Sequence, residues 1–488
     1  MPDQSNAGSF SDLAKSAVQE APGGQPGPVW REVTHLAWPV LAQQVLGLVV
    51  SLTDRWLAGN AAGVDGDGTL SLQGAQTTCF YLAWMIGSLG VLASSGASAL
   101  VARTAGAGDL PMANRACQQS LLLAAGLGLV GWLAGLLWLD DLLLAIHLDG
   151  PAGDLALDYL SVTVLMLPLQ LVGSTAAASL AGAGDTRTGL WVGMGAALLN
   201  LPLAWVGFRG VGPWPGLGIA GIAWGTGLSQ GLGGLALLGL LWRGRSGLRL
   251  RAGGFRPDPG LLWRLLRVSL PAGAESLSLV AGQLLFLTAV NTLGDADRGA
   301  HGVALGWEAV AEIFGMAYAV AANVAVGRNL GAGGPARAMR AGLTSFALGA
   351  LLMSLGGAAA FALAPAMFRL FCPRPEQVPV VEAGVPLLRL VAFSMPMLAS
   401  CHICAGGLRG AGDTRFPLLF TWIGFFLVRI PLTWWLCHEE ITLPGGCVLQ
   451  GWGLGLWGCW LAMQADIQFR GTLFLVRFAR GGWMATRV

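Results

Sequence analysis

Twelve stretches of the chain are apolar over about 20 residues each, the length that an α-helix needs to cross the hydrocarbon core of a membrane. A backbone surrounded by lipid must satisfy its hydrogen bonds internally, so each stretch predicts a transmembrane helix. Composition agrees, because 54% of the 488 residues are hydrophobic and only 11% are charged. The chain is therefore predicted to be an all-α integral membrane protein with helices at 34–58, 74–101, 115–139, 155–181, 187–208, 217–242, 262–292, 300–326, 339–364, 382–407, 416–437 and 452–478.

A repeated hexapeptide indicates that the chain is internally duplicated. Residues 182–187 read Gly-Ala-Gly-Asp-Thr-Arg, and the same six residues return at 410–415, 228 positions later. A weaker pair of glycine-rich segments has nearly the same offset, since Gly106 and Gly331 lie 225 positions apart. We therefore expect two homologous bundles of six helices each.

These repeats divide the chain into five predicted regions. Residues 1–29 have no apolar core, so they are neither a signal peptide nor a span. The regions are a disordered cytoplasmic tail at 1–29, an N-terminal six-helix lobe at 30–245, a cytoplasmic linker at 246–261, a C-terminal six-helix lobe at 262–480 and a cytoplasmic tail at 481–488.

The distribution of arginine predicts the orientation of the spans. Most of the 28 Lys and Arg residues fall in loops on one side of the twelve-span arrangement, and such loops stay in the cytoplasm. Seven arginines lie between 243 and 267 alone. We therefore expect a multi-pass protein of the cell (inner) membrane with both termini in the cytoplasm.

The glycine-rich repeats fall in short turns after spans two, four, eight and ten. Glycine permits a positive φ in such a turn, and Asp185 and Asp413 are placed to cap the helices that follow. A phosphate-binding loop is disfavoured, because the repeats lack a Gly-Lys-Ser/Thr ending and no strand precedes them.

Three polar residues in the spans of the first half are candidates for an ion site. A charge in the bilayer core costs about 2.5 to 3.5 kcal/mol, so an acid such as Asp54 within the first span indicates a specific role. Neighbouring helical positions make poor pairs, so we expect Asp54 to face an internal cavity as a cation site rather than to pair with Arg55. Asn200 and Thr226 lie in spans five and six. Such residues more often bond their own helix, so their role depends on converging with Asp54.

Three acids in the second half are candidates for a substrate cleft or a secondary proton site. Glu275 lies one turn after Pro271, whereas Glu308 and Glu312 are four residues apart and share one face of span eight. Two carboxylates held so close in a low dielectric favour binding of a proton. The alternative is that these acids pair with a buried arginine, for which Arg429 is the candidate.

The cysteines indicate neither a metal site nor a disulfide scaffold. Cys401 and Cys404 flank His402 inside a predicted span with no second pair of ligands, so they are interpreted as small residues on a helix. Cys437 and Cys447 share one predicted outer loop, where a disulfide and two free thiols are both open.

As a set, these features resemble the multidrug and toxic compound extrusion (MATE) transporters. The likeness runs from about residue 30 to 480. Besides the two halves and their turns, it rests on Thr-Asp-Arg-Trp-Leu-Ala-Gly at 53–59, Leu-Asn-Leu-Pro at 199–202 and Gly-Ile-Ala-Gly-Ile-Ala-Trp-Gly-Thr at 218–226. The resemblance implies a V-shaped antiporter, not an enzyme, that expels organic and often cationic compounds as H⁺ or Na⁺ enters. It needs no cofactor apart from that coupling ion.

The resemblance also assigns residues. In the family, a first-span Asp, a fifth-span Asn and a sixth-span Thr form an ion site in the N-terminal lobe, and these match Asp54, Asn200 and Thr226. Ala204 stands where one branch of the family has a second Asp.

The second lobe departs from the sodium-coupled branch. Leu279 and Leu398 stand where that branch has acids, which argues against a sodium site of the familiar form. Glu275, Glu308 and Glu312 are candidates to replace it.

Two other functions, a flippase and a transferase, are alternatives to an antiporter. A lipid-linked sugar flippase of a related fold needs several basic residues for pyrophosphate. Once the arginines near span ends are assigned to the cytoplasmic side, Arg470 among them, only Arg55, Arg389 and Arg429 are left within the spans. A membrane-embedded transferase should gather its acids and histidines at one membrane face, whereas here they are dispersed. Nucleic acid is excluded as a partner, since the chain has no basic run with interleaved aromatics. We expect a monomer that handles a small organic substrate in the bilayer.

Overall fold

The computed structural model describes residues 27–59, 66–145, 150–442 and 448–486, and helices dominate them. Within these residues, ten helices are long and apolar enough to cross a membrane by length and composition alone. Helices α7 (Ile219–Arg243) and α14 (Gly455–Ala479), of 25 residues each, lie beside them and complete two sets of six. The predicted fold class is confirmed.

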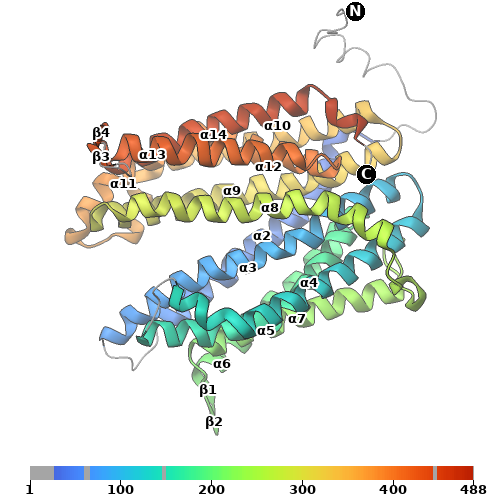
Figure 1. The fold of residues 1–488 in the computed structure, drawn as a ribbon, viewed down its shortest axis with the longest axis horizontal. Coiled ribbons are helices and arrows are strands. Elements are labelled where there is room, and N and C mark those ends of the chain that lie inside the picture. The colour runs from blue at the N-terminus through green and yellow to red at the C-terminus, as the bar shows by residue number, and fades with distance from the viewer. Residues whose placement is uncertain (1–26, 60–65, 146–149, 443–447, 487–488) are drawn as a thin grey trace, which may run out of the picture.

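The first bundle contains α2 to α7, and the second contains α8 to α14 (Figure 1). Several helices extend beyond their predicted spans, because hydropathy reports only the part that matches the hydrocarbon core. The remaining helices of the first bundle are α2 (Val29–Gly59), α3 (Gly66–Gly106), α4 (Leu110–Ala145), α5 (Gly150–Gly182) and α6 (Thr186–Arg209). Those of the second are α8 (Pro259–Asn291), α9 (Asp295–Gly331), α10 (Pro335–Phe371), α11 (Val378–Gly410), α12 (Arg415–Trp422) and α13 (Ile430–Cys437).

Helices α12 and α13 are two parts of one span, joined by a π-helical segment at Ile423–Arg429. The described strands form two short antiparallel hairpins outside the helical bundles. One pairs β1 (Gly210–Val211) with β2 (Trp214–Pro215), and the other pairs β3 (Glu440–Thr442) with β4 (Val448–Gln450). Short 3₁₀ turns lie at Ala252–Phe255, Pro375–Gln377 and Gly482–Ala485.

The first helix of each bundle crosses over to the other bundle. Helix α2 packs against α9 and α10, while α8 packs against α3 and α4. The start of α2 is held there by an ion pair of 2.8 Å between Glu32 and Arg337, and its Val33 is fully buried in the core of the second bundle. Because the first helix of each half packs against the other half, the two halves are arranged as a pseudo-two-fold relation requires.

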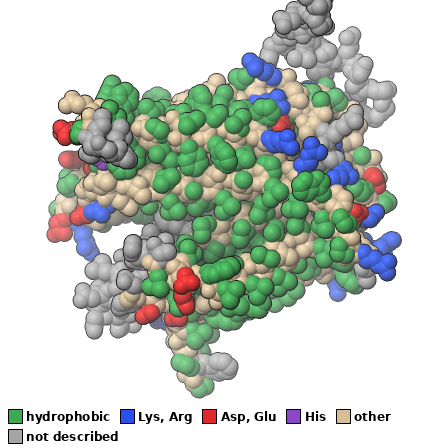
Figure 2. Space-filling view, in the orientation of Figure 1, with side chains coloured by type: hydrophobic (Ala, Val, Ile, Leu, Met, Phe, Trp, Pro, Cys, Tyr) green, Lys and Arg blue, Asp and Glu red, His purple; other side chains and the backbone are tan. Residues whose placement is uncertain are grey.

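Arginine side chains gather at one end of the molecule (Figure 2). We call this the arginine-rich end, where Arg245 pairs with Asp185, Arg337 with Glu32 and Arg477 with Asp413. The Arg103 guanidinium donates to the Thr486 carbonyl over 2.8 Å, so the C-terminal segment is held against the first bundle. From this end the two bundles diverge toward the opposite end (Figure 1).

Equivalent residues of the two halves meet in a seam between α3 and α9. Ser98 Oγ donates to Asn323 Oδ1 over 3.1 Å, and these two positions are 225 apart, as are Gly106 and Gly331. At the seam, a Cβ on Gly106 would collide with the Arg328 carbonyl, and a Cβ on Gly331 would collide with the Arg103 carbonyl. The duplicated glycines thus allow the two backbones to touch at the arginine-rich end.

The four glycine-rich turns adopt the predicted backbone conformation. The last glycine of each has a positive φ, which a side chain would strain. The values are +76° at Gly108, +93° at Gly184, +75° at Gly333 and +83° at Gly412. This prediction is confirmed.

The two copies of the hexapeptide use their aspartates differently. Asp185 caps α6, since its carboxylate accepts from the Thr188 amide over 2.9 Å, as predicted. Asp413 does not cap α12, so that prediction is wrong. Its carboxylate accepts instead from Arg477 of α14 over 2.7 Å, a partner that the hexapeptide itself does not specify.

Replacing Asp185 with alanine is expected to lower the free energy of unfolding by about 0.5–2 kcal/mol, the usual cost of a lost N-cap. Burial raises the pKa of the Asp185 carboxyl, but hydrogen bonds from Ser246 and Thr188 and the charge of Arg245 outweigh burial and leave that pKa below its ordinary value. The carboxylate therefore stabilises the fold above the ordinary aspartate pKa, and this stabilisation is lost as the pH falls through the depressed one. Thermal unfolding in detergent at pH 7 and pH 3 measures both effects.

The exposed Asp140 of α4 provides the control, because Asp140→Ala removes a carboxylate that caps no helix. Equal melting temperatures for Asp185→Ala and Asp140→Ala at pH 7 would contradict the capping role.

Candidate ion site and charged network

The structure brings Asp54, Thr226 and Asn200 together from three helices of the first bundle. Thr226 Oγ1 donates to Asp54 Oδ2 over 3.1 Å, and Asn200 Nδ2 donates to Thr226 Oγ1 over 2.9 Å. Asp54 Oδ1 and Asn200 Oδ1 are both buried and have no hydrogen-bond partner among the described residues. A carboxylate oxygen and an amide oxygen left in this state form a suitable receptor for a proton or a small hard cation.

Close backbone packing places Asn200 and Thr226 side by side. Helices α6 and α7 touch where a Cβ on Gly221 would collide with the backbone of Gly207. One turn away, a Cβ on Gly225 would collide with the backbone of Ala204, which is fully buried. The glycines of 218–226 therefore hold Thr226 against α6. They also pack against Ala204, the position at which one branch of the family that the sequence resembles has a second acid.

A cavity of about 340 Å³ lies beside this group, between α2, α5, α6 and α7. Asn200 is part of its wall, so the ion site and the cavity share a residue. The described lining carries no charge and combines apolar side chains, such as Leu46 and Val50, with the amides of Gln43, Gln170 and Gln230. Such a wall accepts a ligand through shape and neutral hydrogen bonds rather than through ion pairing.

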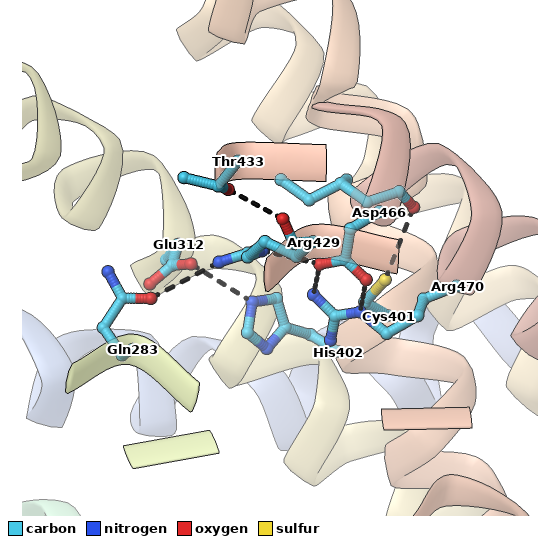
Figure 3. Close-up of polar contacts among 9 residues, drawn as sticks. Gln283, Glu312, Cys401, His402, Arg429, Thr433, Asp466 and Arg470 are labelled. Atoms are coloured by element: carbon cyan, nitrogen blue, oxygen red, sulfur yellow. Dashed lines mark hydrogen bonds and ion pairs between the residues drawn. The ribbon is translucent and has the colours of Figure 1, made fainter. Parts of the chain in front are cut away.

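The second bundle contains a buried network of charges centred on Asp466 of α14 (Figure 3). The Asp466 carboxylate is fully buried and accepts from Arg429 over 2.8 Å and from Arg470 over 2.6 Å. Both guanidinium groups also lie over the Phe425 ring, 4.1 and 4.7 Å from its centroid. One carboxylate between two guanidiniums leaves a net positive charge, which the nearby acids of α9 offset.

The π-helical segment makes this network possible. A Cβ on Gly424 would collide with the Asp466 carboxylate and the Arg470 side chain, so glycine lets α14 approach. The widened π turn ends at Arg429 and directs its side chain into the bundle, where it is 4% exposed. Single π turns occur often at functional positions.

The alternative interpretation pairs the glutamates with Arg429, but among the described residues Arg429 forms its ion pair with Asp466. Arg429 Nη1 donates in addition to Gln283 over 3.3 Å (Figure 3). Glu275 lies elsewhere, in an ion pair of 2.8 Å with Arg409, and accepts from Thr421.

Glu308 and Glu312 do share one side of α9, as expected from their spacing. Glu312 lies 3.5 Å from His402 Nε2 and is about one-third exposed. Glu308 is 5% exposed and lies within electrostatic range of both Glu312 and Arg429. The four predicted residues therefore divide into a separate Glu275 pair and a group of three around Arg429.

Sequence reasoning missed Asp466 and Arg470. The distribution of arginines places Arg470 on the cytoplasmic side, whereas the structure buries it within α14 at 6% exposure. The available signal was their spacing, since an acid and an arginine four residues apart inside a predicted span form an i, i+4 pair. His402 was weighed only as part of a metal motif.

The described residues contain no group of three metal-ligating side chains. Cys404 accepts from Ser400, and Cys401 donates to the Ile467 carbonyl, so both contribute to helix packing as expected. The possible pair of Cys437 with Cys447 cannot be described, because Cys447 lies outside the described residues.

Two six-helix lobes, the first of which contains a buried polar site and a cavity, are the arrangement of a polytopic membrane transporter. The MatE family model matches residues 39–206 and 271–435, one segment in each bundle. The chain therefore belongs to the MatE family of transporters and is not an enzyme.

Similar proteins cover nearly all of the chain. The probable multidrug resistance protein NorM of Thermotoga maritima is 26% identical over 455 residues, covering 93% of each chain. The probable NorM of Burkholderia mallei is 29% identical over 458 residues, covering 92% of each. The multidrug resistance protein PmpM of Pseudomonas aeruginosa is 27% identical over 449 residues, covering 88% of this chain and 89% of PmpM.

Solved structures agree with the fold. A structure described as an outward-facing conformation of a multidrug resistance MATE family transporter of the MOP superfamily superimposes with a TM-score of 0.83 at 19% identity, covering 94% of this chain and 98% of the other. A MOP superfamily transporter from Pyrococcus furiosus superimposes with the same score and coverage.

Proposed function

We propose that the protein is a secondary active antiporter that exports organic, often cationic, compounds in exchange for H⁺ or Na⁺. Support comes from membership of the MatE family and from relatives that are named multidrug resistance proteins. The coupling ion is the one additional component that this activity requires. The protein acts as a monomer in the inner membrane, with the arginine-rich end and both termini in the cytoplasm.

The observation that carries this proposal is the Asp54 carboxylate, whose Oδ1 atom is buried and has no hydrogen-bond partner among the described residues. An incoming cation or proton binds at Asp54 and competes with the hydrogen bond from Thr226. Because Asn200 is bonded to Thr226 and also lines the cavity, the event changes the packing of α2, α6 and α7 around that cavity. Ion entry is in this way coupled to the space that the substrate occupies.

The available energy is adequate for this exchange. One monovalent cation moving through 100 mV releases about 2.3 kcal/mol, which at one-to-one coupling sustains a gradient of about fifty-fold for a neutral substrate.

Glu312 is the proposed secondary site in the second bundle. It is partly exposed and faces His402, so it can bind a proton or a substrate cation. Glu275 has a structural role instead, since its carboxylate is 3% exposed and held by Arg409.

The antiporter is preferred to a flippase for lipid pyrophosphate because two of the three span arginines are otherwise engaged. Arg429 pairs with Asp466, and the Arg389 guanidinium lies 5.6 Å from the Phe361 ring centroid. A pyrophosphate site needs such groups in a cleft and uncommitted.

Transport by Asp54→Asn tests the proposal. Purified protein in vesicles is given either a pH gradient or a sodium gradient, and the movement of a fluorescent organic cation is recorded. One gradient is expected to drive transport by the wild-type protein, and Asp54→Asn is expected to reduce driven transport at least about tenfold, a loss of about 1.4 kcal/mol of coupling.

Asp158→Asn in α5 is the matched control, since Asp158 is an exposed carboxylate of the same bundle. It is expected to transport as the wild type does. Unchanged driven transport in Asp54→Asn would remove Asp54 from the mechanism, and transport that responds to neither gradient would refute the antiporter.

A further inference from the structure

The end of α13 and the start of α14 bring two thiols into contact. Cys437 is the last residue of α13, and Cys459 lies in the second turn of α14. Their side chains lie close enough to interact with each other. Both belong to the buried core of the second bundle, at 4% and 0% exposure. The thiols are free in the structure.

The backbone around these two residues is held by its own hydrogen bonds. The Leu454 amide donates to the Leu436 carbonyl over 2.9 Å, and the Trp452 amide donates to the Trp435 carbonyl over 3.0 Å. A Cβ on Gly458 would lie 3.0 Å from the Cys437 nitrogen, so the two helix ends touch at this point. The thiols are therefore brought together by the fold, through an ordered crossing of the chain.

We propose that Cys437 and Cys459 form a disulfide that joins the last two spans at the outer end of the second bundle. The proposal rests on the proposed topology, which places this end away from the cytoplasm, in a compartment where disulfides persist. The earlier candidate, Cys437 with Cys447, is replaced by a partner that the structure seats against Cys437.

The chemistry requires a disulfide oxidant of that compartment. The thiolate of one cysteine attacks the oxidant's disulfide and forms a mixed disulfide, and the second thiolate then displaces the oxidant. The two cysteines lose two electrons and two protons, and the oxidant leaves as a dithiol. Because both thiols are buried in the folded protein, the bond must form before α13 and α14 finish packing.

The disulfide would restrain the helices that carry the buried charges. Arg429 lies about two turns before Cys437, and Asp466 about two turns after Cys459. The disulfide therefore joins the two spans on the outer side of the Arg429–Asp466 ion pair and resists their separation.

Thiol counting with peptide mapping tests the proposal. Membranes from cells are denatured with an alkylating maleimide and no reductant, and labelled cysteines are identified by mass spectrometry. Two of the eight cysteines should escape labelling and be found in one linked peptide pair, 437 with 459. Cys447→Ser should leave that pair intact, whereas Cys459→Ser should expose Cys437.

A topology control separates this proposal from the antiporter and its orientation. Val448→Cys, in the exposed strand β4 of a variant lacking the other cysteines, is offered an impermeant maleimide on spheroplasts. Labelling from outside together with eight free native thiols, or a link from 437 to 447, overturns the disulfide alone. Protection of position 448 overturns the topology and the disulfide with it, whereas gradient-driven transport by the wild type is a separate readout that neither result changes.

Discussion

Asp466→Leu is expected to destabilise the protein by about 3–5 kcal/mol, the cost of removing one partner from a buried ion pair. The side chain of Asp466 is fully buried and bonded to two guanidinium groups that are themselves 5% and 7% exposed. Without the carboxylate, both positive charges remain in a low dielectric with weakened compensation. We expect little folded protein at 37 °C and a strongly lowered melting temperature in detergent.

The cause can be separated from the loss of packing. In the triple variant Asp466→Leu, Arg429→Met, Arg470→Met, all three charges are gone, and a large part of the stability should return, because apolar side chains can replace a buried ionic triad. The matched control is Asp295→Leu, which breaks an ion pair with Arg298 at an almost fully exposed acid and should change stability little. A triple variant as unstable as Asp466→Leu would show that unpaired charge is not the cause.

Gly331→Val is expected to abolish most transport by forcing the two bundles apart at the arginine-rich end. A Cβ at this position collides with the Arg103 carbonyl of the opposite bundle, and backbone cannot rotate away as a flexible side chain does. Overpacking of this kind costs about 1–3 kcal/mol, which shifts an equilibrium between two arrangements of the bundles by about five- to 150-fold. Gly106→Val should act in the same way, because it meets the Arg328 carbonyl.

Efflux of a fluorescent cation and the separation between spin labels at positions 109 and 334 measure the two effects. Transport should fall while the label separation grows. Gly302→Val is the control, since this exposed glycine of the same α9 helix has open space around it and should transport normally. Normal transport by Gly331→Val would mean that the seam need not close during the cycle.

Much of the fold could be predicted because membrane-spanning helices are specified locally. A stretch of twenty apolar residues must form a helix in lipid, because lipid offers the backbone no other hydrogen-bond partner. The duplication could also be recognised from short segments of the sequence, namely the hexapeptide and the pair Gly106 and Gly331. The structure adds that these two glycines face the opposite bundle reciprocally, which repetition in a sequence does not reveal.

The candidate ion site was predictable only in part. Asp54 was conspicuous because a lone acid in an apolar span is costly. Asn200 and Thr226 became meaningful through the family resemblance, and the structure then placed their side chains in one hydrogen-bonded chain with Asp54. Their convergence depends on the close crossing of α6 and α7 at glycines, a contact between segments that no local pattern reports.

Sequence by itself determined which segments cross the membrane, that they come in two sets of six, and where the glycine turns lie. These properties depend on short-range chemistry: apolar length and the φ that only glycine adopts freely. Only the tertiary structure decided the partners of the buried charges. Arg429 had several acids within its own bundle as possible partners, and the π turn with Gly424 selected Asp466 by bringing α14 close. Coulomb attraction favours any nearby opposite charge, so the pairing follows from the packing of the helices and not from the order of residues along the chain.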